Sequence, residues 1–205
     1  MHDSNAYRTT GVDENIVNMT YKEVRRLDAG SWYSDEYKGE KVPGLREVLE
    51  LAQGKIKLNI ELKPADNGEE LARKTVALIE KYNMENDCVI TSFSSSALLA
   101  AKSCDENIRV GYILSAAYGD YYDMKNIDFF SVNAAFLSKR TIDAIHNSGK
   151  QVYAWTVNNK DSIKNLTNKG VDGVITDNPV LARETIYSRD TSETIVNMIR
   201  YVFNQ

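Results

Sequence analysis

From residue 55 onward the chain alternates short apolar runs with longer segments of helical period. The apolar runs are rich in Val, Ile, Tyr and Phe, which favours β-strands, and they cover 55–62, 88–93, 109–114, 128–133, 151–157 and 172–177. The segments between them repeat apolar residues at the spacing of a helix with one buried face, and they cover 68–83, 94–104, 138–149 and 159–170. Gly149 and Gly170 stand where two of these helices should end.

Strands that alternate with helices in this way predict parallel βαβ units and an α/β fold. Right-handed crossovers between such units build either an open doubly wound sheet or a (β/α)8 barrel of the TIM type. Polar or aromatic side chains follow the predicted strand ends at Glu61, Lys63, Ser92, Asn133, Trp155, Asn158 and Asp177. In a barrel these ends form one mouth, where the chemistry takes place. The pattern therefore favours a barrel, of which about six strands are visible.

The first 54 residues have a different pattern, with many turn residues, a short helix predicted at 21–28 and a second helix at 45–53. The connection from 114 to 128 has no helix signal, and its Tyr118, Tyr121 and Tyr122 are candidates for the rim of a site. We predict two parts: a partial barrel over 1–187 and an amphipathic helix over 188–205. That helix is expected to dock on the barrel or on a second copy; the alternative, contact with a membrane, is disfavoured because its polar face lacks the Lys and Arg of an interfacial helix.

Composition excludes several classes of protein. The formal net charge is -4 and the basic residues are scattered, which argues against a nucleic-acid partner. Two cysteines, Cys88 and Cys104, have neither the number nor the spacing of a disulfide framework or a zinc site. No stretch has the ~18 consecutive apolar residues of a membrane span, and the first residues lack the pattern of a signal peptide.

The strand that ends in IELK carries the first candidate chemistry. Alternation along a strand places Glu61 and Lys63 on one face, where a carboxylate could hold a hard divalent cation and an ammonium could meet a phosphate. Taken alone, the pair is more typical of a structural ion pair. His2 alone is typical of a solvated residue, His146 of helix packing, and Trp155 of the core or of a pocket wall.

Together the motifs say more than each does alone. HDSNAYRTTG, LDAGSWYS with KVPGLREVLEL, NIELK, TSF, WTVN and GVDGVITDNP occur in an order and at spacings that resemble the glycerophosphodiester phosphodiesterase family. The resemblance covers residues 1 to about 187. It implies a (β/α)8 barrel that hydrolyses glycerophosphodiesters to glycerol 3-phosphate and an alcohol with a divalent cation, calcium or magnesium.

The resemblance also implies roles for individual residues. His2 matches the histidine of the family's His-Asp motif, one of two general acid–base histidines. Glu61 matches a metal ligand, Lys63 the lysine that contacts phosphate, and Trp155 the aromatic that borders the glycerol end of the pocket. A cation and a lysine would offset the phosphate charge that grows in the transition state, and an imidazole would move the proton.

The sequence departs from the family pattern at its start, because a His-Arg-Gly motif and a Glu-x-Asp motif occur nowhere in it. We interpret it as the C-terminal part of a phosphodiesterase, through a misplaced start, a cloned fragment or a degenerate paralogue. Impaired activity and weak metal binding are then expected, and the alternative is a non-catalytic remnant that binds phosphate or a protein. The location is either cytoplasmic or tethered to a membrane through a missing N-terminal region. Unpaired sheet edges would invite self-association.

Overall fold

The computed structural model describes residues 1–116, 119 and 121–187. Its centre is one parallel sheet of six strands in the order β1-β2-β3-β4-β5-β6, so that each strand pairs with its neighbour in the sequence. The strands are β1 (Leu58–Leu62), β2 (Cys88–Ser92), β3 (Arg109–Leu114), β4 (Phe129–Asn133), β5 (Gln151–Trp155) and β6 (Gly173–Val174). All six predicted strands are confirmed, with shorter bounds at several ends.

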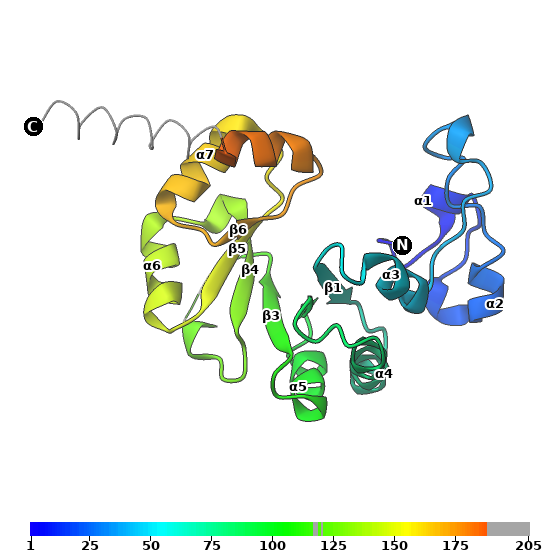
Figure 1. Ribbon diagram of the computed structural model, residues 1–205, viewed down its shortest axis with the longest axis horizontal. Helices are drawn as coiled ribbons and strands as arrows, with labels where there is room; N and C mark the ends of the chain where they lie inside the picture. Colours follow the sequence, from blue (N-terminus) through cyan, green and yellow to red (C-terminus); the bar gives the residue numbers. More distant parts are fainter. Residues whose placement is uncertain (117–118, 120, 188–205) are drawn as a thin grey trace, which may run out of the picture.

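Figure 1 shows the sheet curled into part of a barrel, with helices on its outer side. These helices are α3 (Leu45–Ala52), α4 (Gly68–Lys81), α5 (Ser95–Cys104), α6 (Lys139–Asn147) and α7 (Lys160–Lys169). Within the described residues β1 and β6 each pair on one side only. The predicted open barrel is therefore confirmed, whereas self-association stays a prediction.

Alternation along each strand divides the sheet into two faces. Leu62, Ile90, Val110, Phe130 and Val152 point outward and join the helices in one buried apolar cluster. The other face, which is the inner side of the curl, carries the alternate residues. The core of the protein therefore lies between sheet and helices, and the inner face is left for the site.

The connection between β3 and β4 forms a short 3-10 turn, Tyr121–Asp123, in its described residues, and aromatic side chains cover the outer face of the sheet there. The Tyr121 ring packs edge-on against Phe130 on the outer face, with the ring centroids 5.3 Å apart. Tyr122 packs against the same apolar cluster. The prediction that these two tyrosines line the rim of a site is therefore wrong, because both rings pack on the apolar outer face of the sheet and neither lines the hollow at the strand ends. Tyr118 lies outside the described residues.

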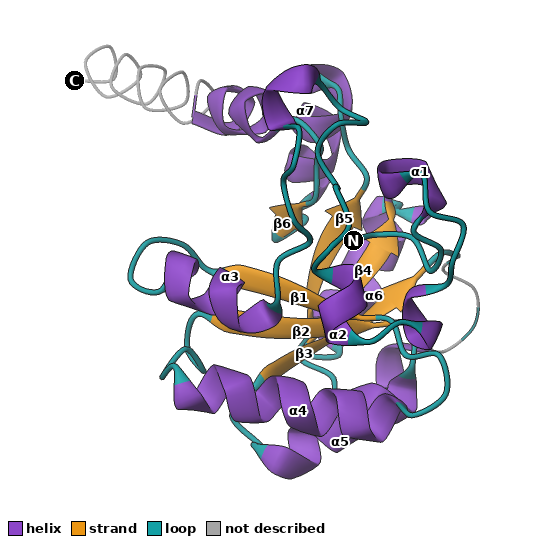
Figure 2. Ribbon diagram, turned by 90° about the vertical axis from the view of Figure 1, so that its right-hand side faces the viewer, coloured by secondary structure: helices purple, strands orange, loops and turns teal. Residues whose placement is uncertain are grey.

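Residues 1–44 form an arm beside β1 and α3 (Figures 1 and 2). Its regular elements are short: α1 (Tyr7–Thr10), α2 (Tyr21–Val24) and 3-10 turns at Ile16–Asn18 and Asp35–Tyr37. The helix predicted over 21–28 ends at Val24, because the N–H groups of Arg26 and Leu27 donate to carbonyls only three residues back. A capping box between Thr20 and Glu23 fixes its start.

One predicted strand begins later in the structure than in the sequence pattern. β1 begins at Leu58 rather than 55, because the N–H groups of Lys55 and Ile56 donate to the Ala52 carbonyl at the end of α3. The helix predicted over 188–205 lies outside the described residues. None of the helices within the described ranges combines the length and apolar composition that a bilayer crossing requires.

Candidate active site

A hollow of about 560 Å³ opens on the inner side of the sheet at the C-terminal ends of the strands. This is the end of a parallel barrel at which sites form. Its lining joins polar and aromatic side chains from the arm and from most of the strands: His2, Asn59, Glu61, Lys63, Thr91, Phe93, Ile113, Ser131, Trp155, Thr156, Ile175 and Asp177. All four residues predicted for the site, His2, Glu61, Lys63 and Trp155, are among them.

Glu61 and Lys63 project from the same face of β1 and its extension, as the alternation predicts. The Lys63 ammonium lies 3.9 Å from the nearer Glu61 oxygen, so the structural ion pair and the position in the hollow are both observed. The same ammonium donates a 2.9 Å hydrogen bond to the His2 carbonyl. Lys63 thus ties the arm to the sheet, while its side chain remains partly exposed and open to an anion.

His2 enters the hollow from the arm. Its Nδ1 atom lies 3.0 Å from an Asp3 carboxylate oxygen, and the other Asp3 oxygen accepts a 2.5 Å hydrogen bond from Arg8 Nε. The second histidine of the sequence is placed elsewhere: His146 binds Asp172, which also accepts a hydrogen bond from the Val152 N–H near the start of β5. His146 therefore lies at the opposite end of the strands, which agrees with giving it no role.

Trp155 forms an aromatic wall of the hollow at the end of β5. Its indole N–H donates a 2.9 Å hydrogen bond to the Ser131 carbonyl on the neighbouring strand, which fixes the ring. Phe93, just past β2, meets it edge-on with the ring centroids 6.3 Å apart. The two rings present an apolar surface beside the charged groups of β1. Trp155 is thus a pocket wall, the second of the two readings of its sequence position.

Three polar residues of the hollow were missed from the sequence. Asn59 and Thr91 lie deeper in the hollow and share a 3.0 Å hydrogen bond between β1 and β2, while Ser131 lies on β4. The signal was present, because strand alternation places Asn59 on the face of Glu61. Asp177 was noted as a strand-end residue, and it lines the hollow with its carboxylate accepting a 2.7 Å hydrogen bond from Asn158.

Two other strand-end residues have structural tasks. Ser92 is fully buried, donates to the Leu62 carbonyl and accepts from the Ser94 N–H. Asn133 accepts from the Ala135 N–H at the start of a short 3-10 turn, Ala134–Phe136. Neither side chain lines the hollow. Polarity at a strand end therefore indicated the mouth of the sheet but did not distinguish a lining residue from a cap.

Glu61 is the predicted metal ligand, and the structure tests whether its surroundings suit a cation. Within the described residues no three His, Cys, Asp or Glu side chains gather where they could share an ion. A hard cation takes about six or more oxygen ligands, and the ammonium 3.9 Å from Glu61 competes for the same charge. The described residues therefore do not form a complete metal-binding set.

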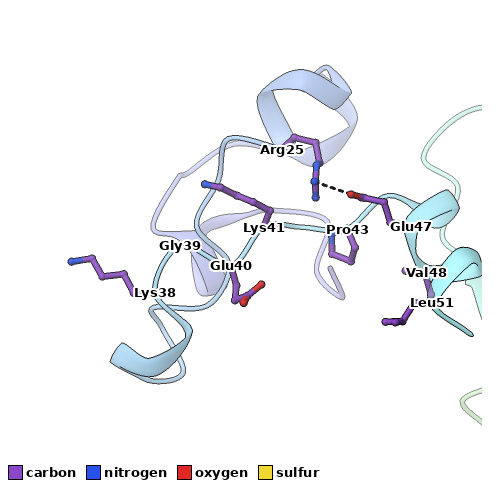
Figure 3. Close-up of a pocket in the computed structure, with 9 residues that line it drawn as sticks. All are labelled: Arg25, Lys38, Gly39, Glu40, Lys41, Pro43, Glu47, Val48 and Leu51. Atoms are coloured by element: carbon purple, nitrogen blue, oxygen red, sulfur yellow. Dashed lines mark hydrogen bonds and ion pairs between the residues drawn. The ribbon is translucent and has the colours of Figure 1, made fainter.

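A second hollow, of about 570 Å³, lies between the arm and α3 (Figure 3). Its central contact is the ion pair between Arg25 and Glu47, at 2.9 Å, and Arg25 also donates to the Val42 carbonyl. Both signs of charge occur in its lining, together with Val48 and Leu51. None of its lining residues belongs to the hollow at the strand ends. This hollow lies at the contact between the arm and α3, which the ion pair between Arg25 and Glu47 stabilises.

The protein is an α/β half-barrel, and its mouth gathers an ammonium, carboxylates, an imidazole and two aromatic rings. Such a mouth suits a small polar ligand with an anionic group. The chain belongs to the glycerophosphoryl diester phosphodiesterase family, whose sequence model matches residues 1–181. The resemblance noted from its motifs is thereby confirmed.

Individual relatives agree with this assignment. The chain is 27% identical over 210 residues to a glycerophosphodiester phosphodiesterase of Caldanaerobacter subterraneus, covering 98% of this chain and 79% of the relative. It is 28% identical over 202 residues to one of Bacillus subtilis, covering 88% and 69%. A phosphodiesterase of Oleispira antarctica, solved in complex with the product sn-glycerol-3-phosphate, is 30% identical with a TM-score of 0.80, covering 91% of this chain and 78% of that one.

Proposed function

We propose that this chain binds glycerophosphodiesters in the hollow at the strand ends and hydrolyses them to glycerol 3-phosphate and an alcohol. The observation that carries the proposal is that Lys63, Trp155 and His2, three residues that match family motifs, line one hollow although they come from distant parts of the sequence. The similarity to the Oleispira phosphodiesterase, which was solved with sn-glycerol-3-phosphate as its product, supports the same substrate class.

Each residue has a task in this proposal. The Lys63 ammonium attracts the non-bridging phosphate oxygens and offsets the charge that repels a nucleophile. Trp155 and Phe93 give the carbon skeleton of the glycerol an apolar wall. The His2 imidazole acts as a general base that takes the proton of the attacking hydroxyl or water.

The reaction also needs a proton for the leaving alcohol, and this limits the expected rate. His2 is the one histidine of the sequence in the hollow, since His146 lies at the other end of the strands. Water would then protonate the alcohol in place of a positioned acid, which is worth about 10²–10⁴-fold in rate. We propose slow turnover for this chain.

Binding of sn-glycerol 3-phosphate tests the substrate assignment independently of turnover. In a calorimetric titration, Lys63→Met should weaken binding about 10- to 100-fold, as expected when a hydrogen bond to a charged group is lost. Lys57→Met is the matched control, because Lys57 is an exposed lysine near the other end of β1, paired only loosely with Asp87 at 4.0 Å. If both variants bind as the parent does, the hollow is not the phosphate site.

Turnover is measured separately, by the conversion of a phosphodiester signal to a phosphomonoester signal in ³¹P NMR. His2→Gln should abolish the conversion and leave binding of glycerol 3-phosphate intact. Conversion at an unchanged rate in His2→Gln would remove this histidine from the proposed chemistry.

A non-catalytic phosphate-binding barrel is the second candidate, and the incomplete metal-binding set favours it. Under either candidate we propose that calcium or magnesium binds weakly and through Glu61. Calorimetric titration with calcium should show a weak signal that Glu61→Gln removes. Glu69→Gln is the control, because Glu69 is an exposed carboxylate on α4. Tight calcium binding that survives Glu61→Gln would contradict this. Binding of glycerol 3-phosphate without any phosphomonoester formation would favour the second candidate.

A further inference from the structure

The loop that follows α2 in the arm is held by one carboxylate. Asp28 accepts hydrogen bonds from the N–H groups of Gly30, Ser31 and Gly39 and from the Ser31 hydroxyl. The bonds from Ser31, followed by those from the other two N–H groups, hold the pKa of the Asp28 carboxyl well below its ordinary value. Asp28 therefore stays charged and fixes residues 28–39 as one turn.

This turn presents Trp32 in a fixed orientation at the surface. Half of the Trp32 side chain is exposed, yet its indole N–H donates a 2.9 Å hydrogen bond to the Ala29 carbonyl, and Tyr33 meets its ring edge-on at 5.9 Å. The guanidinium of Arg8 lies over the ring, 5.3 Å from its centroid. An exposed tryptophan held in this way acts as a platform for the cation above it.

Arg8 connects Trp32 to the candidate active site through Asp3, which contacts His2. Its Nε donates a 2.5 Å hydrogen bond to one Asp3 oxygen and its terminal nitrogen a 3.3 Å bond to the other, while His2 Nδ1 lies 3.0 Å from that second oxygen. The bond from Arg8, followed by that from His2, lowers the pKa of Asp3 to about 2. The carboxylate is therefore ionised around neutral pH and can only accept hydrogen bonds.

A carboxylate that only accepts requires the proton on the nitrogen that faces it. We propose that Trp32 is a positioning residue, which acts through Arg8 and Asp3 to hold neutral His2 with its proton on Nδ1 and the Nε2 lone pair free as the base. This inference rests on the proposed role of His2 in proton transfer. It adds Arg8 and Trp32, neither of which lines the hollow, to the residues on which that role depends.

His146 provides an internal reference in the same molecule. It faces Asp172 through Nε2, at 2.9 Å, so the same reasoning places its proton on Nε2. The two histidines of the chain are thus expected in opposite tautomers, and neither assignment depends on turnover. The side-chain hydrogen bonds of His146 and Asp172 join them to each other and to Val152, and all three residues lie outside the arm.

Long-range ¹H–¹⁵N NMR spectra of the full chain, recorded at alkaline pH, report the tautomers directly. The parent should show the Nδ1–H form for His2 and the Nε2–H form for His146. Trp32→Leu should shift the His2 tautomer ratio toward Nε2–H by about two- to fivefold, in line with a cation–π contact at an exposed site. Trp32→Phe, which keeps a ring under Arg8, should restore the parent ratio.

Tyr37→Leu is the matched control, because Tyr37 is an exposed aromatic residue of the same loop whose ring contacts Tyr33, while the ring under Arg8 is that of Trp32. It should leave both ratios unchanged, and His146 should be unchanged in every variant. A His2 ratio that is the same in Trp32→Leu as in the parent would overturn the proposal. So would an equal shift in Trp32→Leu and Tyr37→Leu, which would reveal general loosening of the loop. Failure of the proposed function would appear instead as lost glycerol 3-phosphate binding or turnover, with the tautomers as expected.

Discussion

The arm, residues 1–44, and the strand–helix body, residues 45–187, keep their shapes by different means. The body has an apolar core between sheet and helices, whereas the arm contributes three buried apolar side chains, Ala6, Leu27 and Val42. Several large apolar side chains of the arm are exposed instead, among them Tyr7, Val17, Trp32 and Tyr33. The arm is held by caps, turns and ion pairs, such as those of Asp28 and Arg25.

The candidate site combines both kinds of structure. Glu61, Lys63 and Trp155 stand on strands of the rigid body, and His2 comes from the arm. The hydrogen bond from Lys63 to the His2 carbonyl joins the two regions directly. Binding groups therefore sit on the part of the molecule that the hydrophobic effect stabilises, and the proton-transfer group sits on the part that depends on a few polar contacts.

The largest expected effect comes from opening the core of the body. Phe130 is fully buried, so Phe130→Ala should lower the free energy of unfolding by about 3–5 kcal/mol, measured by urea denaturation followed by far-UV circular dichroism. A matched valine pair sharpens the comparison. Val132→Ala in the body should cost roughly 2 kcal/mol of global stability, and Val42→Ala in the arm should cost clearly less. Equal losses for the two valines would mean that arm and body unfold as one unit.

Substitution of two glycines, one in the body and one in the arm, tests the same comparison with a smaller expected loss of stability. A Cβ on Gly111 would lie 2.1 Å from the Phe129 ring, so Gly111→Ala should overpack the inner face of the sheet and cost about 1–3 kcal/mol of global stability. A Cβ on Gly30 would lie 1.9 Å from the Tyr37 carbonyl oxygen, so Gly30→Ala should open the loop around Asp28.

The arm variant should differ from the body variant in kind. In Gly30→Ala we expect faster amide hydrogen exchange across 28–39, while the free energy of unfolding in urea stays within about 0.5 kcal/mol of the parent. A large drop in global stability from Gly30→Ala would show that the arm supports the core.

This contrast also explains what the sequence could predict. Strands and helices of the body follow periods of two and of three to four residues, so apolar side chains mark them, and the rule that places Glu61 inward also places Asn59 there. The path from His2 through Asp3 and Arg8 to Trp32 has no period. It depends on a turn that Asp28 closes around Gly30 and Gly39, and such side-chain-to-backbone bonds leave only local signals. The segment between β3 and β4 has no helix signal in the sequence. The sequence did not show that Tyr121 would cover the outer face of the sheet there.

The smallest expected effect is the loss of order in the arm under acid. Asp3, with its pKa lowered from 3.8 to about 2, and Asp28, also lowered, each contribute stability that is fully present above their ordinary pKa and lost as pH falls through the folded-state value. The arm should therefore loosen between about pH 4 and pH 2.

The fluorescence of Trp32 in a Trp155→Phe background reports this loosening, because Trp32 and Trp155 are the two tryptophans of the chain. Arg8→Met should move the Asp3-dependent part of this transition to higher pH, since Arg8 is the largest cause of the Asp3 shift. Far-UV circular dichroism, dominated by the body, should change less over the same range. Simultaneous changes in both signals would place the acid-sensitive carboxylates in the body and refute the division between the two regions.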